Sequence, residues 1–121
     1  FENLDMIIVK TVFRLLPGQT DAITARMQSL MEKRRASQPL ELPSAGSTFK
    51  RPEGAYAGAL IEQAQLKGVR VGGASVSEKH AGFVVNTGGA TAQDVRALIA
   101  LIQKRVFETS GFHLQPEVRI W

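Results

Sequence analysis

The feature that most constrains the fold is a long amphipathic segment near the carboxyl end, "ATAQDVRALIALIQKRVFETSG" (residues 90–111). Its apolar residues recur at intervals of three and four, which places them along one face of an α-helix. Thr91 or a neighbouring residue can cap the start of this helix, and Gly111 can end it. Such a helix must bury its apolar face against another layer of structure. The predicted buried face consists of Val95, Leu98, Ile99, Ile102, Val106 and Phe107.

Two further helices are predicted before this one. Residues 20–37 follow the breaker "PGQT", begin with a capping threonine, Thr20, and are closed by Pro39. Their basic end, Lys33 to Arg35, suits the negative end of a helix dipole, and we interpret it as a solvated helix terminus. Residues 56–66, "YAGALIEQAQL", are typical of a short amphipathic helix that ends before Gly68. The apolar positions of the first helix are Ile23, Met27, Leu30 and Met31.

Short runs rich in β-branched residues predict the strands of a small sheet. The first covers residues 5–16, and two more, "VRVGGASVS" and "AGFVVNTG", lie on either side of a polar connection from Ser77 to His80. Gly72 and Gly73 predict a bend or a close backbone approach. A final strand is predicted in "HLQPEVRIW" (residues 113–121). We therefore predict a single α+β domain over residues 1–121, with a small mixed or antiparallel sheet packed against two longer helices and one short helix.

Composition narrows the functional classes. The 121 residues contain no cysteine, which excludes disulfides and thiolate metal sites, and the two histidines are far apart in sequence. No apolar run approaches the roughly 20 residues that a membrane-spanning helix needs. The net charge of +4 permits nucleic-acid binding, but a single Tyr and a single Trp give little aromatic surface for a nucleic-acid adaptor. These observations favour a cytoplasmic, metal-free protein without a membrane or nucleic-acid partner.

One stretch departs from both helix and strand patterns, "SAGSTFKRPEG" (residues 44–54). From Gly46 to Pro52 its small and hydroxyl-bearing residues can bring backbone N–H groups together, and Lys50 and Arg51 add two cationic donors. Such a loop suits a diphosphate or a carboxylate, and a serine hydroxyl inside it could deliver a proton. An ordinary surface turn explains the same residues, and the loop matches neither a Walker motif nor a dinucleotide fingerprint.

Two other candidates are weak when judged on pattern alone. "SEKHAG" (residues 77–82) puts His80 beside a cation and an acid, although most lone histidines have structural or solvent roles. Glu117 can be interpreted as an exposed strand carboxylate paired with Arg119, a pair that would contribute little.

Taken in order, five segments resemble the carboxyl-terminal domain of the UDP-N-acetylenolpyruvoylglucosamine reductase family: "PSAGSTFKRPEG", "YAGALIEQAQLKG", "VGGASVSEKHAGFVVN", "ATAQDV" and "LQPEVRI". The resemblance covers essentially the whole chain. "SEKHAGFVVN" is similar to the shorter, second type of this family, which lacks an extra tyrosine-bearing loop.

The resemblance implies an oxidoreductase of peptidoglycan synthesis, also called UDP-N-acetylmuramate dehydrogenase. Its substrate is UDP-N-acetylglucosamine enolpyruvate; NADPH reduces FAD, and the flavin then delivers hydride to the vinyl carbon. The family's amino-terminal part binds FAD, so no residue of this chain is expected to bind a cofactor. We expect the 121-residue chain alone to be colourless and inactive. A non-catalytic module that binds a UDP-sugar or another anion is the alternative.

The resemblance also implies roles for particular residues. Ser47 corresponds to the proton donor, and Glu117 to a glutamate on the carboxylate side of the substrate, where it helps only if it carries or shares a proton. Lys50 is a nearby cation that can stabilise the departing alkoxide. Arg51 replaces the asparagine that contacts the diphosphate in the other branch, and a guanidinium can bind phosphate bidentately. The resemblance is less specific for three further substrate-binding candidates, Lys79, His80 and Tyr56. Tyr56 can instead pack within its helix.

Overall fold

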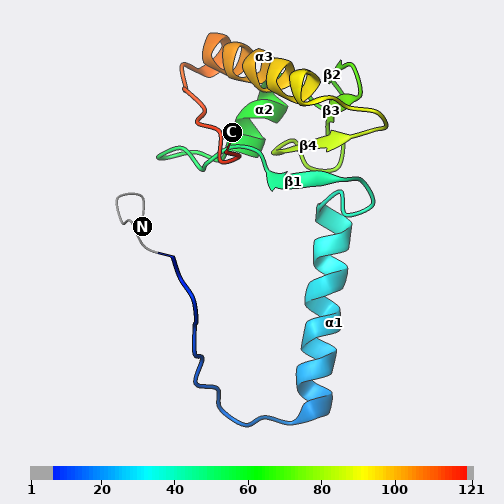
Figure 1. The fold of residues 1–121 in the computed structure, drawn as a ribbon, viewed down its shortest axis with the longest axis vertical. Coiled ribbons are helices and arrows are strands. Elements are labelled where there is room, and N and C mark those ends of the chain that lie inside the picture. The colour runs from blue at the N-terminus through cyan, green and yellow to red at the C-terminus, as the bar shows by residue number, and fades with distance from the viewer. Residues whose placement is uncertain (1–6, 120–121) are drawn as a thin grey trace.

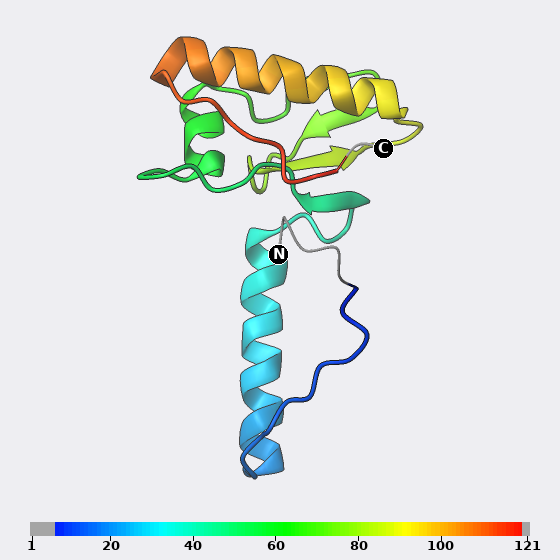
Figure 2. The same cartoon turned by 60° about the vertical axis from the view of Figure 1, so that its left-hand side comes forward.

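The computed structural model describes residues 7–119. The helices are α1 (Thr20–Ser37), α2 (Ala57–Gln63) and α3 (Ala92–Ser110), and the strands are β1 (Ser44–Ser47), β2 (Arg70–Val71), β3 (Ala74–Val76) and β4 (Phe83–Asn86). The four strands form one antiparallel sheet in the order β1-β4-β3-β2. Figures 1 and 2 show α3 lying across this sheet with α2 beside it. The predicted α+β fold is confirmed.

The core lies between α3, α2 and the sheet. Four residues of the predicted α3 face are buried, Leu98, Ile99, Ile102 and Val106, and each contributes roughly 1.5–3 kcal/mol on burial. Phe107 was expected in this face but is 46% exposed. Its ring stacks instead on that of His113, with centroids 4.1 Å apart.

Both predicted ends of α3 are confirmed, and its first turn is also tied to the sheet. Asp94 N donates to Thr91 Oγ1 at 3.1 Å, and Thr91 N donates to Asp94 Oδ2 at 2.9 Å, which forms a capping box. Oδ2 of Asp94 also accepts from Gly73 N at 3.5 Å, in the turn between β2 and β3. Gly111 is the carboxyl-terminal cap. One carboxylate thus joins the helix to the hairpin beneath it.

The segment "VRVGGASVS" forms two strands where one was predicted. β2 and β3 pair as a hairpin, with Val71 opposite Ala74. The turn between them is Gly72–Gly73, so the predicted bend is confirmed and is sharp enough to reverse the chain.

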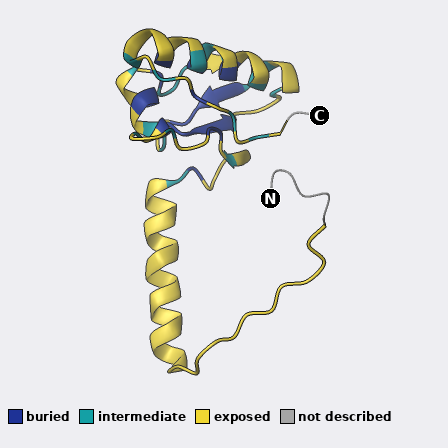
Figure 3. Ribbon diagram, turned by 90° about the vertical axis from the view of Figure 1, so that its left-hand side faces the viewer, coloured by how far each residue is buried: buried dark blue, intermediate teal, exposed yellow. Residues whose placement is uncertain are grey.

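Helix α1 is confirmed over residues 20–37, but the prediction that Thr20 caps it is wrong, because Thr20 is already the first helical residue. The cap position is Gln19, whose side chain forms no capping hydrogen bond. The helix also does not cover the sheet. All of its residues are exposed, and Figure 3 shows it projecting away from the packed part of the chain. At its end, Arg34 Nε donates to Gln38 Oε1 at 2.9 Å, and Pro39 is buried. Within residues 7–119, α3 therefore packs on the sheet with α2 beside it, and α1 does not. The exposed fractions along the predicted apolar face of α1 are 48% for Ile23, 66% for Met27, 55% for Leu30 and 46% for Met31.

The structure differs from the prediction at the first and the last predicted strand. Residues 7–16 form no strand and are exposed throughout, while Asp5 and Met6 lie outside the described residues. Strand propensity is expressed only where another strand offers hydrogen bonds, and residues 7–16 run apart from the sheet (Figure 1). The predicted strand 113–121 is reduced to one isolated bridge, Phe49 to Pro116, because proline has no N–H to extend the ladder. Ile120 and Trp121 lie outside the described residues.

The capping box predicts an acid-dependent contribution to stability. Hydrogen bonds from the Thr91 backbone and side chain, then from the Gly73 backbone, lower the pKa of Asp94 from 3.8. The folded state therefore favours the carboxylate, so this stabilisation is present above pH 3.8 and is lost as the pH falls through the lower folded pKa. We expect Thr91→Ala to cost about 1 kcal/mol at pH 7.

Urea unfolding of wild-type protein and Asp94→Asn at pH 7 and at pH 3 measures this effect. The difference in the free energy of unfolding between wild type and Asp94→Asn should be larger at pH 7 than at pH 3. Asp21→Asn, in the first turn of the uncapped helix α1, is the matched control. The assignment is wrong if Asp94→Asn and Asp21→Asn respond alike to acid.

Candidate functional site

One cavity of about 430 Å³ lies between the end of β1, the start of α2 and the turn before β4. Every predicted site residue except Lys50 lines it. These residues come from three segments of the chain that are distant in sequence, residues 47–56, residues 79–80 and residue 117. They are Ser47, Arg51, Tyr56, Lys79, His80 and Glu117.

A β-bulge places Ser47. Ser44 pairs with Val85 and Ser47 with Phe83, so β1 contains one more residue than the matching stretch of β4. Gly46 takes up the extra residue with a φ of +85°, a conformation that favours glycine. Ser47 was predicted inside a loop, but it is the last residue of this strand. Its hydroxyl donates to the Phe49 carbonyl at 3.3 Å, and the residue is exposed to the cavity.

Backbone hydrogen bonds bring Glu117 to the same place. Glu117 N donates to the carbonyl of buried Thr48 at 2.9 Å, and Lys50 N donates to the Gln115 carbonyl at 2.8 Å. The stretch that contains Glu117 therefore runs antiparallel to the residues that follow Ser47. Ser47 and Glu117 line one cavity, although 70 positions of sequence separate them.

Arg51 and Tyr56 form a cation–π pair at the cavity wall. The guanidinium carbon lies 4.0 Å from the centroid of the Tyr56 ring. Within residues 7–119, no carboxylate forms an ion pair with Arg51. Tyr56 is 62% exposed and stands immediately before α2, so the alternative that it packs within its helix is not realised. The pair holds a positive charge at the cavity without neutralising it.

His80 is held rigidly. Its Nδ1 accepts a hydrogen bond from Gly82 N at 3.1 Å, so the ring is the tautomer that carries hydrogen on Nε2. Its ring meets Phe83 edge-on, with centroids 5.0 Å apart. A Cβ atom added at Gly58 of α2 would lie 3.3 Å from His80 Cε1. The ring thus fills the space between α2 and the turn, and its Nε2–H is a hydrogen-bond donor.

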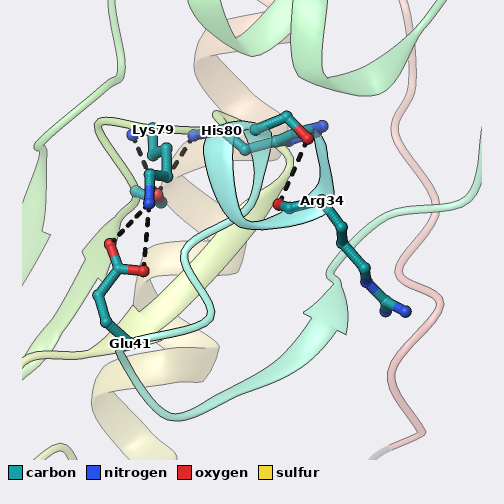
Figure 4. Close-up of polar contacts among 6 residues, drawn as sticks. Arg34, Glu41, Lys79 and His80 are labelled. Carbon is teal, nitrogen blue, oxygen red and sulfur yellow. Dashed lines mark hydrogen bonds and ion pairs between the residues drawn. The ribbon is translucent and has the colours of Figure 1, made fainter. Parts of the chain in front are cut away.

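Lys79 reaches the cavity from the same turn but is paired with an acid. Its Nζ lies 3.2 Å and 3.3 Å from the two carboxylate oxygens of Glu41 (Figure 4). The pKa of Glu41 is lowered, first by its own backbone amide and then by the Lys79 ammonium. Ser77 Oγ accepts from both Lys79 N and His80 N at 3.2 Å, which fixes the backbone of the turn.

Lys50 lies elsewhere. It lines a neighbouring hollow of about 330 Å³, together with Arg51, Phe112 and His113. Consecutive residues of an extended chain point to opposite sides, which explains why Lys50 and Arg51 diverge. The proposed influence of Lys50 on Ser47 stays a prediction.

Sequence reasoning missed two charged residues of the cavity wall, Glu62 and Lys67. Neither residue was selected as a site candidate from the sequence. Lys67 Nζ contacts Glu62 Oε1 at 2.6 Å. Lys67 follows the end of the helix and has no periodic signal, so only the folded chain reveals that it returns to the cavity. Within residues 7–119, no group of three His, Cys, Asp or Glu residues could hold a metal ion.

Comparisons with known proteins show the family to which the chain belongs. Residues 38–121 match the family model described as UDP-N-acetylenolpyruvoylglucosamine reductase, C-terminal domain. The chain belongs to this family. It is 53% identical over 115 residues to the reductase of Clostridium beijerinckii, covering 95% of this chain and 38% of the relative. It is also 53% identical over 119 residues to that of Lactiplantibacillus plantarum, covering 98% of this chain and 39% of the relative.

A solved structure is similar as well. The UDP-N-acetylenolpyruvylglucosamine reductase from Thermus caldophilus matches with a TM-score of 0.74 and 35% identity, over 89% of this chain and 38% of that one. The chain thus spans about two fifths of the length of the reductases it matches. No helix within residues 7–119 is long and apolar enough to cross a membrane.

The closeness of Gly58 to the His80 ring predicts that the effect of Gly58→Ala on stability depends on whether the ring is present. Alanine normally stabilises a helix by about 0.5–1 kcal/mol relative to glycine. In wild-type protein the added methyl group would press on the His80 ring, so we expect Gly58→Ala to be neutral or destabilising. In a His80→Ala background the ring is gone, and the same substitution should stabilise the protein.

Thermal or urea unfolding of both single variants and the double variant measures this coupling, which we expect to be about 1 kcal/mol. Additive effects of Gly58→Ala and His80→Ala would show that the ring does not occupy the space beside α2.

Proposed function

We propose that this chain is the substrate-binding part of a UDP-N-acetylmuramate dehydrogenase and supplies the proton for vinyl reduction. The substrate is UDP-N-acetylglucosamine enolpyruvate, and the product is UDP-N-acetylmuramate. The observation that carries the proposal is that Ser47 and Glu117 line one cavity beside the guanidinium of Arg51. The proposal includes the cytoplasmic location expected from the cysteine-free composition.

Reduction of the enolpyruvyl ether adds a hydride to the terminal vinyl carbon and a proton to the neighbouring carbon. The hydride comes from reduced FAD, which NADPH regenerates. Ser47 gives its hydroxyl proton to the neighbouring carbon, and the alkoxide left behind must be stabilised by nearby donors. The exposed hydroxyl of Ser47 donates a hydrogen bond to the Phe49 carbonyl at 3.3 Å. It can reorient toward a bound substrate.

Charge develops on the substrate carboxylate as the hydride arrives, because the intermediate is enolate-like. Glu117 stabilises it by sharing a proton with that carboxylate, since two bare carboxylates would repel each other. The hydrogen bond from Glu117 N to the Thr48 carbonyl holds the glutamate beside Ser47. Both groups can therefore act on adjacent atoms of the substrate.

The diphosphate binds Arg51 in this proposal. Its guanidinium has no ion-pair partner among residues 7–119, and its central carbon lies 4.0 Å from the centroid of the Tyr56 ring. The charge is therefore not neutralised by a carboxylate and can bind phosphate oxygens. Tyr56 then covers the uridine or the sugar with the exposed part of its ring. Nε2–H of His80 donates to a substrate oxygen.

We propose that the cavity of this chain serves the UDP-sugar and not the flavin. The cavity has one exposed aromatic ring suited to stacking, Tyr56, and this proposal assigns that ring to the uridine or the sugar. We therefore assign no flavin or NADPH contact to this chain and propose that the remainder of the reductase binds both. The isolated chain should show no flavin spectrum and no NADPH oxidation.

Ser47→Ala in the full-length reductase tests the role of Ser47. We expect reduction of the vinyl group to fall by about 10²–10⁴-fold, while NADPH reduces the flavin at nearly the normal rate. Stopped-flow absorbance of the flavin separates the two steps. Ser44→Ala, on the same strand but outside the cavity, is the matched control. Equal rates for Ser47→Ala and wild type would favour a non-catalytic UDP-sugar-binding module.

Arg51→Gln tests where the diphosphate binds. Loss of a charge-assisted contact should raise the KM for the UDP-sugar by about tenfold and leave kcat nearly unchanged. Arg70→Gln, at an exposed position of β2, controls for the loss of net charge. A KM that responds equally to the two substitutions would contradict the assignment.

A further inference from the structure

Lys79 lies between two hollows of the molecule. It lines the substrate cavity, and it also lines a second hollow of about 170 Å³ to which Glu41 belongs. The ammonium is held on the Glu41 side, with Nζ 3.2 Å and 3.3 Å from the two carboxylate oxygens (Figure 4). A lysine that borders the cavity thus has its charge directed away from it.

The Glu41–Lys79 pair affects the net positive charge that the cavity presents to an anion. Lys67 is matched by Glu62 at 2.6 Å, and Lys79 is matched by Glu41. Arg51 is the cavity cation that, within residues 7–119, has no carboxylate in ion-pair contact. The number of positive charges that an entering anion meets therefore depends on whether these two lysines stay with their acids.

The two sides of the Glu41–Lys79 pair differ in freedom. The backbone of Lys79 is fixed because its N–H donates to the buried hydroxyl of Ser77. Its side chain has several rotatable bonds and can turn about this fixed point. Glu41 is held beside the sheet by the connection from α1 to β1, where Pro39 is buried. Movement of the ammonium alone can transfer the charge from one hollow to the other.

We propose that Glu41 competes with the anionic substrate for Lys79, and that the ammonium moves from Glu41 to the diphosphate when the UDP-sugar binds. The inference rests on the proposed function. The pair is exposed, with 35% of the Lys79 side chain and 60% of the Glu41 side chain accessible. Exposed ion pairs are weak, so a diphosphate with two negative charges can displace one carboxylate. Glu41 accordingly weakens substrate binding and favours release of product.

The test uses the full-length reductase with UDP-N-acetylglucosamine as a competitive ligand, because it carries the diphosphate but cannot be reduced. The inhibition constant is measured for wild type, Glu41→Gln, Lys79→Met and the double variant. Glu41→Gln should tighten binding by about two- to fivefold, the range expected from breaking an exposed pair. Lys79→Met should weaken binding. In the Lys79→Met background, Glu41→Gln should have no further effect.

Glu78→Gln is the matched control, because it removes the same charge from the residue next to Lys79 without removing the carboxylate that Lys79 contacts. The proposal is wrong if Glu41→Gln leaves binding unchanged or weakens it, if Glu78→Gln tightens it equally, or if the effect persists without Lys79. Failure of wild-type enzyme to bind the ligand would instead contradict the proposed function.

Discussion

Thr48 joins the three segments that make the cavity. Its N–H donates to the Gly82 carbonyl at 2.9 Å, and its side-chain oxygen accepts from Val84 N at 3.0 Å. Its carbonyl accepts from Glu117 N at 2.9 Å. Because Thr48 is only 3% exposed, water cannot easily replace these bonds, and loss of any of them would leave a buried polar group unpaired. Ser47, the histidine turn and Glu117 therefore hold their relative positions through the backbone of one residue.

Around Thr48 the site is built mainly from turns, loops and short elements, and not from the long helices. The β-bulge at Gly46 places Ser47 opposite Phe83 in the sheet, and the rings of Phe83 and His80 meet in a T-shaped contact. Helix α2 is short, and its contribution is to close the cavity on the side of His80 and to carry Glu62. The long helix α3 stabilises the sheet from the opposite side and contributes no residue to the cavity. Packing and chemistry are thus divided between different parts of the chain.

The sequence was informative where structure depends on near neighbours. Helix α3, its capping residue and its terminal glycine follow from signals within a few positions of one another, and all three were predicted correctly. Strand pairing depends on distant partners. For that reason the apolar run from Ile7 to Leu16 was wrongly predicted as a strand, and the small residues of β1 were taken for a loop.

The site shows the same distinction. Periodicity gave no reason to select Ser47 or Glu117, and both came from resemblance to a family. Adjacent cations were treated together, but Arg51 lines the cavity and Lys50 a neighbouring hollow. The pairing of Lys79 with Glu41 joins positions 38 residues apart, and no local pattern indicates it.

The most direct test is a crystal structure of the full-length reductase with UDP-N-acetylglucosamine enolpyruvate bound and the flavin oxidised. We predict that the vinyl carbon next to the carboxylate lies within reach of the Ser47 hydroxyl, with Glu117 at the carboxylate and Arg51 at the diphosphate. An enolpyruvyl group bound away from Ser47 and Glu117 would contradict it.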